Sequence, residues 1–139
     1  MSNYLRQGSL SSKRACSLLS LNDKAKEGIM LGIVDYGAGN QTSVRRALDA
    51  LGITSTISHD AEKLWSCQGI IVPGVGAAGQ AMQQLRGTGL DGLLKDAAKQ
   101  GRPVLGICLG CQILLDYSEE NDTDLLGLIH GQCRRFALT

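Results

Sequence analysis

Short apolar runs alternate with amphipathic stretches along most of this chain, and the two patterns predict different elements. Val44, Leu48 and Leu51 recur at the three- and four-residue spacing of one helix face, whereas residues 69–72 form a short apolar run typical of a buried strand. The same reasoning predicts strands at 31–35, 53–58, 69–72 and 103–107, and helices at 44–51, 60–65, 77–85, 90–99 and 109–117.

The order of these elements predicts an α/β fold. Strands that alternate with helices form parallel βαβ units with right-handed crossovers, so we expect a mostly parallel sheet flanked by helices. Past the last helix, residues 118–124 are expected to form a polar loop and residues 125–136 to contain one or two more strands. Ligands bind at the carboxyl ends of such strands, where the glycine-rich turns of this chain fall.

Residues 1–29 differ from the rest of the chain. They are rich in serine, carry no acidic residue before Asp23 and show no strong periodicity. They also lack the apolar core of a secretory signal. We therefore expect a disordered leader or an upstream extension at 1–29 and one domain at 30–139, with Met30 as a candidate natural start.

The composition of the chain indicates which kinds of binding partner and which cellular compartment to expect. The 139 residues suffice for one modest domain, and 14 basic against 13 acidic residues leave a net charge of +1. Without a basic face or an acidic run, we expect neither nucleic acid nor a membrane surface as partner. Five cysteines without a disulfide spacing favour a reducing, cytoplasmic compartment. No zinc-site spacing occurs, so neither a metal nor another cofactor is expected.

Cys108 stands where a buried strand turns into a helix. Gly106 and Gly110, two residues before and after it, permit the tight elbow that exposes a nucleophile in a strained backbone position. At a helix N-terminus, unpaired N–H groups and the helix dipole favour the thiolate. The amide after the elbow, that of Leu109, then provides half of an oxyanion hole, so we interpret Cys108 as a candidate nucleophile.

Two other interpretations of this cysteine stay open at this point. Free cysteines are among the most buried residue types, so Cys108 fits a structural thiol as well. Together with Cys111 it also forms a C-x-x-C at a helix start, the arrangement of dithiol redox sites. The Trp or Pro that usually lies in or next to thioredoxin-like motifs is missing here.

Two glycine turns and one acidic residue are further candidates for a role in binding or catalysis. The turn Gly74-Val75-Gly76 follows the third strand, and its amides complete an oxyanion hole if that strand neighbours the cysteine strand; otherwise it is a mere turn. The turn of residues 37–40 resembles a dinucleotide fingerprint but lacks the third glycine. Glu120 is either a solvated helix end or a group that reaches a ligand's ammonium.

His59 and His130 are the candidate bases in this sequence. His59 follows the second strand in a polar Ser-His-Asp run, and His130 lies in the last predicted strand region. Neither stands in an H-x-E or H-x-D pairing that would orient an imidazole toward a nucleophile. The sequence therefore provides no clear partner for the thiol.

Taken together, these motifs resemble the class I (triad) glutamine amidotransferases. Within that family they are most similar to the glutaminase subunits of imidazole glycerol phosphate synthases, which serve histidine biosynthesis. The elbow carries the superfamily resemblance, and the opening Asp-Tyr-Gly-Ala-Gly-Asn with Pro-Gly-Val-Gly carries the subfamily one. The matching residues are 32–40, 43–48, 72–77, 82, 89–90, 103–110, 112, 118–120, 127–129 and 136.

The resemblance implies a flavodoxin-like α/β domain and a thiol-dependent hydrolysis of glutamine. Cys108 would attack the side-chain amide, with the amides of Leu109 and residues 74–76 holding the oxyanion. Gln112 and Glu120 match positions that grip the amino-acid end of glutamine. The resemblance also implies that Gly37, Gly39 and Asn40 face a (β/α)8 cyclase, the heterodimer partner that receives the ammonia.

The sequence also departs from the family pattern. Cys111 stands where methionine is usual, Ala78 where an aromatic is common, and Gln41 replaces a typical leucine. The family's catalytic His and Glu lie in an H-x-E segment past the elbow, and nothing in these residues matches it. We therefore expect a C-terminally incomplete domain that is inactive or nearly so by itself.

Three functions compete at this stage. The first is the glutaminase just described, and the second is another triad amidotransferase, such as that of pyridoxal phosphate synthesis. The third is a non-catalytic remnant that docks the cyclase through residues 37–40. The partner that the chain binds or stimulates discriminates the first two, and binding without glutamine turnover identifies the third.

Overall fold

A computed structural model describes residues 28–137 of the chain. The predicted leader at 1–29 lies outside the described residues except for Gly28 and Ile29, which lead into the first strand. Within the described range, no helix has the length and apolar character needed to cross a membrane.

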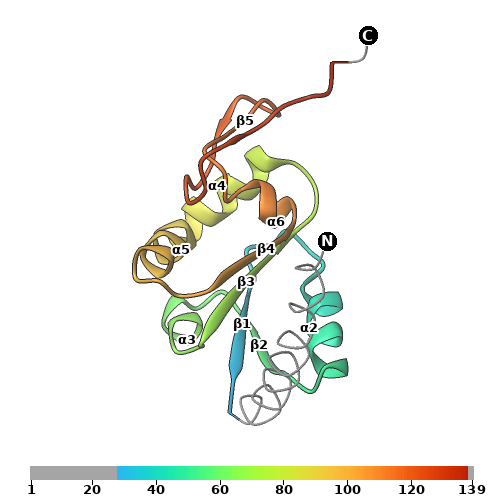
Figure 1. The fold of residues 1–139 in the computed structure, drawn as a ribbon, viewed down its shortest axis with the longest axis vertical. Coiled ribbons are helices and arrows are strands. Elements are labelled where there is room, and N and C mark those ends of the chain that lie inside the picture. The colour runs from blue at the N-terminus through green and yellow to red at the C-terminus, as the bar shows by residue number, and fades with distance from the viewer. Residues whose placement is uncertain (1–27, 138–139) are drawn as a thin grey trace, which may run out of the picture.

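Four parallel strands form the main sheet, in the order β2-β1-β3-β4 (Figure 1). This confirms the predicted α/β class and the predicted strands, with ends shifted by one or two residues. Because the strands run in one direction, their carboxyl ends meet at one edge of the sheet. The strands are β1 (Met30–Val34), β2 (Thr54–Ser58), β3 (Gly69–Gly74) and β4 (Val104–Cys108).

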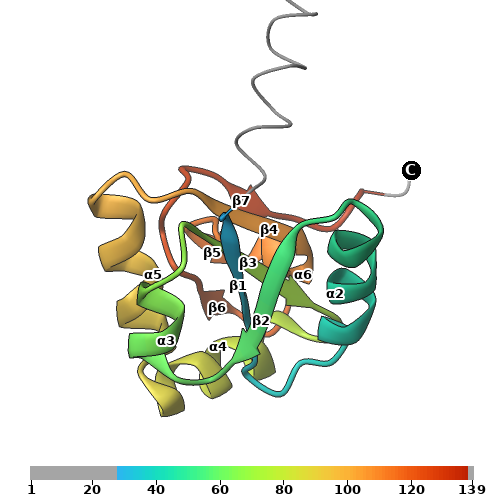
Figure 2. The same cartoon turned by 90° about the horizontal axis from the view of Figure 1, so that it is seen from below.

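Helices cover both faces of this sheet, as Figure 2 shows. Alternate residues of β3 point to opposite faces, so Ile71 packs with α2 while Ile70 and Val72 pack into the larger core beneath the other helices. The helices are α2 (Gln41–Ala50) on one face and α3 (Ala61–Trp65), α4 (Ala78–Thr88) and α5 (Leu90–Lys99) on the other.

Local capping explains where two of these helices begin or end. The Asp60 side chain accepts hydrogen bonds from the amides of Glu62 and Lys63, at 2.9 and 3.4 Å, which starts α3. The predicted break at residues 87–89 is confirmed only at Gly89, whose φ of 73° separates α4 from α5. The helix continues through Gly87 and Thr88 because neither needs a non-helical backbone there.

The helix predicted at 109–117 is wrong in length, since α6 spans only Leu109–Gln112. The carbonyls of Ile113 and Leu114 accept hydrogen bonds from the amides of residues 126, 128 and 129, at 2.9–3.0 Å. Those carbonyls would have to accept from residues 117 and 118 if the helix continued. Tertiary hydrogen bonding to a distant segment therefore ends the helix, which local periodicity cannot reveal.

A second, three-stranded sheet follows, where a polar loop was predicted at 118–124. It has the order β6-β5-β7, with β5 antiparallel to β6 and parallel to β7. The expectation of one or two strands within residues 125–136 is confirmed by β7. These strands are β5 (Tyr117–Ser118), β6 (Thr123–Asp124) and β7 (Gln132–Cys133).

Candidate active site

Cys108 is the last residue of β4 and the N-cap of α6. Its backbone has φ 55° and ψ −119°, a region that a residue with a side chain rarely adopts. Its thiol is free and exposed. The predicted strand-to-helix elbow is confirmed, and the interpretation of Cys108 as a buried structural thiol is wrong.

The two glycines around the elbow are required by packing. A side chain at Gly110 would collide with the carbonyl oxygen of Val72 in the neighbouring strand. A Cβ at Gly106 would lie 2.6 Å from the Cα of Cys111. The short helix therefore packs directly onto the backbone of β3 and β4, and this contact presents Cys108 at the edge of the sheet.

The glycine turn after β3 lies beside the cysteine, because Gly74 pairs with Cys108 in the parallel register. A Cβ built on Gly74 would lie 3.2 Å from the amide nitrogen of Gly110. Val75 is half exposed, and Gly76 has a φ of 97°. The expected neighbourhood of the two strands is thus confirmed, and a role of these amides in an oxyanion hole stays a prediction.

Tyr36 anchors the start of this turn from the first strand region. Its buried hydroxyl donates a 2.7 Å hydrogen bond to the carbonyl of Pro73. Burial raises the pKa of Tyr36 from 10.0 to about 12, so the phenol remains a hydrogen-bond donor well into the alkaline range. Residue 73 is thereby held in place immediately before the glycine turn.

A pocket of about 460 Å³ brings Gln112 and Glu120 together, as a shared substrate site requires. The Glu120 carboxylate also accepts a 3.2 Å hydrogen bond from the amide of Ala78 at the start of α4. Glu120 lies in the turn between β5 and β6 and not at a helix end, and its side chain is exposed. The pocket is lined by Gln112, Ser118, Glu119, Glu120, Gln132, Cys133, Arg134 and Arg135.

Sequence reasoning missed the last four lining residues. Arg134 donates to Gln132 Oε1 from Nε and Nη2, at 3.1 and 2.8 Å, and its Nε lies 3.8 Å from Glu119 Oε1. Acidic and basic side chains therefore share one pocket, as a zwitterionic ligand would need. Two adjacent arginines at residues 134 and 135 were a visible signal, but the small sheet that folds them back was not predicted.

The interpretation of Cys108 and Cys111 as a dithiol redox pair stays a prediction. Cys108 and Cys111 are both free and exposed. Burial raises the pKa of the Cys133 thiol, and charge at Cys111 and Glu120 raises it further. Cys133 and Cys111 therefore lie close enough to influence each other, although one is in β7 and the other in α6.

Neither histidine contacts the candidate nucleophile. His59 follows β2, which is separated from β4 by two strands, or by three strand spacings of roughly 14 Å in total. The His130 side chain is fully exposed, and its Nδ1 lies 3.4 Å from Asp116 Oδ2. Within residues 28–137, no hydrogen bond joins either imidazole to Cys108.

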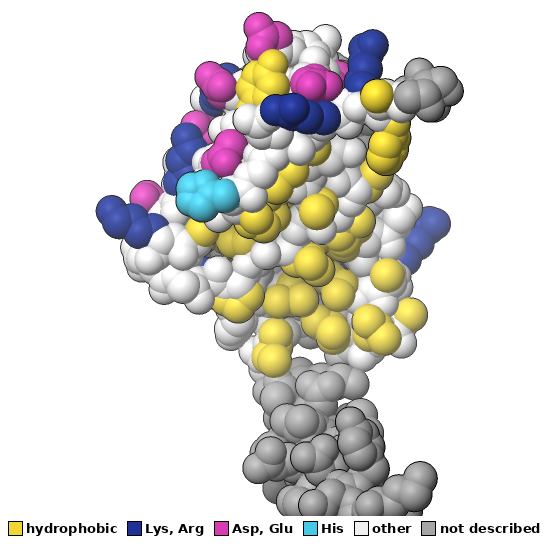
Figure 3. Space-filling view, turned by 45° about the horizontal axis from the view of Figure 1, so that its top comes forward, with side chains coloured by type: hydrophobic (Ala, Val, Ile, Leu, Met, Phe, Trp, Pro, Cys, Tyr) yellow, Lys and Arg dark blue, Asp and Glu magenta, His cyan; other side chains and the backbone are white. Residues whose placement is uncertain are grey.

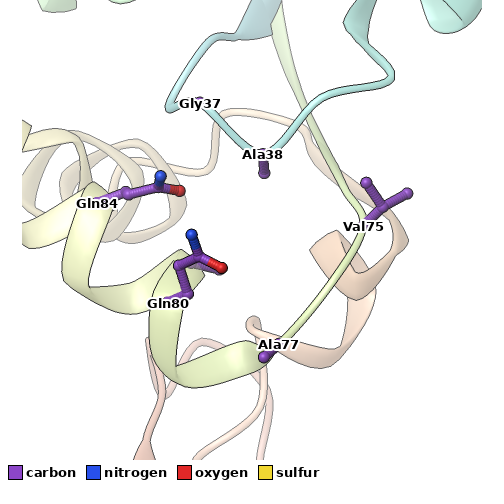
Figure 4. A pocket seen from close by; sticks show the side chains of 7 residues that line it. Gly37, Ala38, Val75, Ala77, Gln80 and Gln84 are labelled. Carbon is purple, nitrogen blue, oxygen red and sulfur yellow. The ribbon is translucent and has the colours of Figure 1, made fainter.

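The turn after β1 forms a smaller pocket of about 190 Å³ against α4 (Figure 4). Figure 4 shows Gly37 and Ala38 facing Gln80 and Gln84 across it, with Val75 on its rim. Gly37, Gly39 and Asn40, the expected partner-facing residues, all have positive φ angles, from 68° to 86°. A Cβ on Gly39 would lie 3.6 Å from Val75 Cγ2, so this turn contacts the glycine turn beside Cys108.

No metal site was found in the part of the chain that the structure describes. There, no group of three or more His, Cys, Asp or Glu side chains is arranged to hold an ion.

The strand-to-helix turn at Cys108 has the geometry of a nucleophile elbow, with the Gly74 turn in register beside it. The polar pocket reaches the last residue of the same short helix, Gln112. A model of the family described as glutamine amidotransferase class-I matches residues 32–130. The chain belongs to this family, as the motifs of the sequence indicated.

Two curated relatives show which members of this family the chain is similar to. The chain is 62% identical over 107 residues to the imidazole glycerol phosphate synthase subunit HisH of Nitratidesulfovibrio vulgaris, covering 77% of this chain and 50% of that protein. It is 64% identical over 107 residues to the protein of the same name from Maridesulfovibrio salexigens, again covering 77% and 50%. The chain thus spans about half the length of these relatives.

A solved structure agrees on the fold. A crystal structure of a glutamine amidotransferase matches with a TM-score of 0.65 and 22% identity, covering 73% of this chain and 54% of that one. At this identity the likeness concerns the fold alone, and it supports the parallel sheet with helices on both faces.

Proposed function

We propose that this chain carries the nucleophile half of a glutaminase of the imidazole glycerol phosphate synthase type. The observation that carries the proposal is the exposed Cys108 at its strained elbow, in register with Gly74. The HisH names of the relatives favour this glutaminase over that of pyridoxal phosphate synthesis. The product would be ammonia for histidine biosynthesis in the cytoplasm.

In the reaction we propose, the Cys108 thiolate attacks the side-chain amide carbon of glutamine. A C–S bond forms, the C–N bond breaks, and the nitrogen leaves as ammonia after taking a proton from solvent. Water then attacks the thioester carbon: a C–O bond forms, the C–S bond breaks, and one proton of the water passes to the sulfur, which releases glutamate and regenerates the thiol. The negative charge that develops on the amide oxygen would be held by the amides of Leu109 and of residues 74–76, which lie beside the elbow.

The amino-acid end of glutamine would occupy the 460 Å³ pocket. Glu120 would accept the α-ammonium group, and the Gln112 amide would hydrogen-bond the backbone end of the ligand. The mixed charge of the lining, with Glu119 and Arg134 opposite in sign, supports a zwitterionic amino acid as ligand.

The partner would be a (β/α)8 cyclase subunit bound as a heterodimer. The relatives are named as subunits of a synthase, which supports a partner chain. Gly37, Gly39 and Asn40 would meet it, because their turn is exposed and touches the glycine turn beside the nucleophile. Ammonia would then pass from the elbow into the partner without entering bulk water.

A second candidate function is docking of the cyclase without turnover. It is favoured by the absence of any hydrogen bond from His59 or His130 to Cys108 within residues 28–137, which leaves the thiol without a base there. Binding of the cyclase by a chain that produces no ammonia would support this function over the first.

A glutamine analogue with a diazoketone in place of its side-chain amide tests the proposed function. We expect it to alkylate Cys108, to be blocked by excess glutamine, and to leave a Cys108→Ser variant unlabelled. A Cys111→Met variant is the matched control and should label normally. Labelling that persists at an equal rate in Cys108→Ser would overturn the proposal, and so would indifference to glutamine.

A further inference from the structure

Glu120 contacts two parts of the molecule that the proposed mechanism treats separately. It lines the 460 Å³ pocket, and its Oε2 accepts a 3.2 Å hydrogen bond from the amide of Ala78. No hydrogen bond within residues 28–137 engages its other oxygen, Oε1. One carboxylate therefore reaches both the ligand pocket and the beginning of α4.

The hairpin that carries Glu120 packs along α4. A Cβ on Gly79 would lie 3.2 Å from the Cβ of Asn121 and 3.3 Å from Thr123 Oγ1. Further along the helix, Arg86 Nη2 donates a 2.8 Å hydrogen bond to the carbonyl of Asp124. These contacts hold the hairpin in place, so the position of Glu120 is set by more than its own hydrogen bond.

Glu120 provides the N-terminal cap that α4 otherwise lacks. Ala77, the N-cap residue, has no side chain that can bond to the first amides of the helix. A carboxylate at this end satisfies one free N–H group and complements the helix dipole. The cap comes from a residue 42 positions later in the chain, so it joins two distant segments.

The capped amide, that of Ala78, stands two residues after the end of the glycine turn beside Cys108. One end of that turn is fixed where Tyr36 donates to the Pro73 carbonyl, at 2.7 Å. The other end is fixed where Glu120 accepts from Ala78. Between the two anchors, Val75 is half exposed and Gly76 adopts a φ of 97°.

We propose that Glu120 is a positioning residue that couples substrate recognition to the oxyanion turn. Its Oε2 holds residues 74–77 in place through the Ala78 amide, while Oε1 receives the α-ammonium of glutamine. This inference rests on the proposed function and deepens it, because the same side chain that recognises the substrate also sets the geometry of the turn that would stabilise the tetrahedral intermediate.

An activated ester separates the two roles of Glu120, since it has no ammonium group. With p-nitrophenyl acetate, the Cys108 thiolate attacks the carbonyl carbon, a C–S bond forms, and p-nitrophenolate leaves with the electron pair of the broken C–O bond. The step passes through a tetrahedral oxyanion but needs no proton for the leaving group. The rate of acetylation at Cys108 of the 139-residue chain, followed by peptide mass spectrometry, therefore reports the oxyanion turn and the reactivity of the thiol, without any contribution from ammonium recognition.

Two variants give different expected results. Glu120→Ala removes both contacts, so acetylation of Cys108 should slow by about tenfold to a hundredfold, and hydrogen exchange at the Ala78 amide should accelerate. Glu120→Gln keeps an oxygen that can accept from Ala78 but loses the charge. It should acetylate within about threefold of the parent rate, yet lose most of its labelling by the diazoketone analogue of glutamine.

Iodoacetamide and Asp124→Asn serve as controls. Iodoacetamide alkylates a thiol without an oxyanion intermediate, so its rate at Cys108 should be the same in Glu120→Ala and the parent chain. Asp124→Asn changes an exposed carboxylate of the same hairpin and should leave the acetylation rate unchanged.

Equal acetylation by Glu120→Ala and the parent chain would overturn the inference, and so would an equal loss in Glu120→Ala and Glu120→Gln. A parallel loss of iodoacetamide alkylation in Glu120→Ala would also contradict it, since a general disturbance of the elbow would then explain the result. None of these outcomes affects the proposed function, which stands or falls on glutamine-protected labelling of Cys108.

Discussion

The two faces of the main sheet are covered to different extents. On the face under α3, α4 and α5, Ile70 and Val72 are almost completely buried, and so is Leu94 of α5. On the other face α2 covers Ile71, but its neighbour in β4, Leu105, is 57% exposed. Both residues point to the same face because they pair in the parallel register.

This difference shows that the coverage of one face stops before the edge strand. In Figure 3, most of the visible hydrophobic side chains, drawn in yellow, lie in the middle and lower part of the described surface. Exposed apolar surface beside an unpaired strand edge is typical of a surface that contacts another element or chain. The helix-rich face, by contrast, forms one continuous core cluster that joins three helices to the sheet.

Truncating a side chain in the helix-rich face should have the largest effect. Leu94→Ala removes a fully buried side chain and leaves a cavity, which should lower the free energy of unfolding by about 2–5 kcal/mol. Urea unfolding followed by circular dichroism measures the change. If the free energy of unfolding falls less in Leu94→Ala than in Leu105→Ala, the comparison of the two faces is wrong.

Alkaline pH should weaken the same core through Tyr36. Burial raises its pKa from 10.0 to about 12, so the folded chain keeps a proton that the unfolded chain releases above pH 10. The contribution is complete below pH 10 and is lost as pH rises to 12, by about 2–3 kcal/mol in total. Urea titrations at a series of pH values test this. The Tyr36→Phe variant should have a free energy of unfolding about 1 kcal/mol lower than the parent at neutral pH, because it lacks the hydrogen bond to Pro73. Between pH 10 and 12 it should lose less of that free energy than the parent.

Removing a helix cap should have a smaller effect. Asp60→Ala removes the side chain that accepts from the amides of Glu62 and Lys63, and should cost about 1 kcal/mol of unfolding free energy. Asp49→Ala, an exposed substitution in α2, is the matched control and should change stability by less than about 0.5 kcal/mol. Equal losses in the two variants would contradict the assigned cap.

The smallest effect is expected on the open face. Leu105→Ala shortens a side chain that is already 57% exposed, so the unfolding free energy should change by about 0.5 kcal/mol or less. Binding of a hydrophobic dye such as ANS should fall, because the exposed apolar surface is reduced. A loss above about 2 kcal/mol would show that Leu105 is packed in solution.

Much of the fold could be predicted from residue patterns. The four strands, their parallel arrangement and helix α5 followed from apolar periodicity and glycine positions, because these elements are decided by local sequence and one buried face. The elbow at Cys108 also followed, since Gly106 and Gly110 leave few other structures for that stretch.

The region past the elbow could not be predicted in the same way. Helix α6 ends early because the carbonyls of Ile113 and Leu114 bond to residues 126–129, which lie more than a dozen positions away. The small sheet and the arginines of the pocket depend on that folding back. The contact from Glu120 to Ala78 joins segments 42 residues apart, and no local pattern indicates such a pair.

The packing of Gly110 against the Val72 carbonyl has a consequence for mutational tolerance at the elbow. In a Cys108→Ala chain, where no chemistry remains, positions 106 and 110 should still reject every residue larger than glycine, because the obstacle is backbone rather than substrate. A G-x-C-x-G stretch therefore indicates that the chain folds into a strand-to-helix elbow. By itself it does not distinguish a working enzyme from a relative that has lost its catalytic activity.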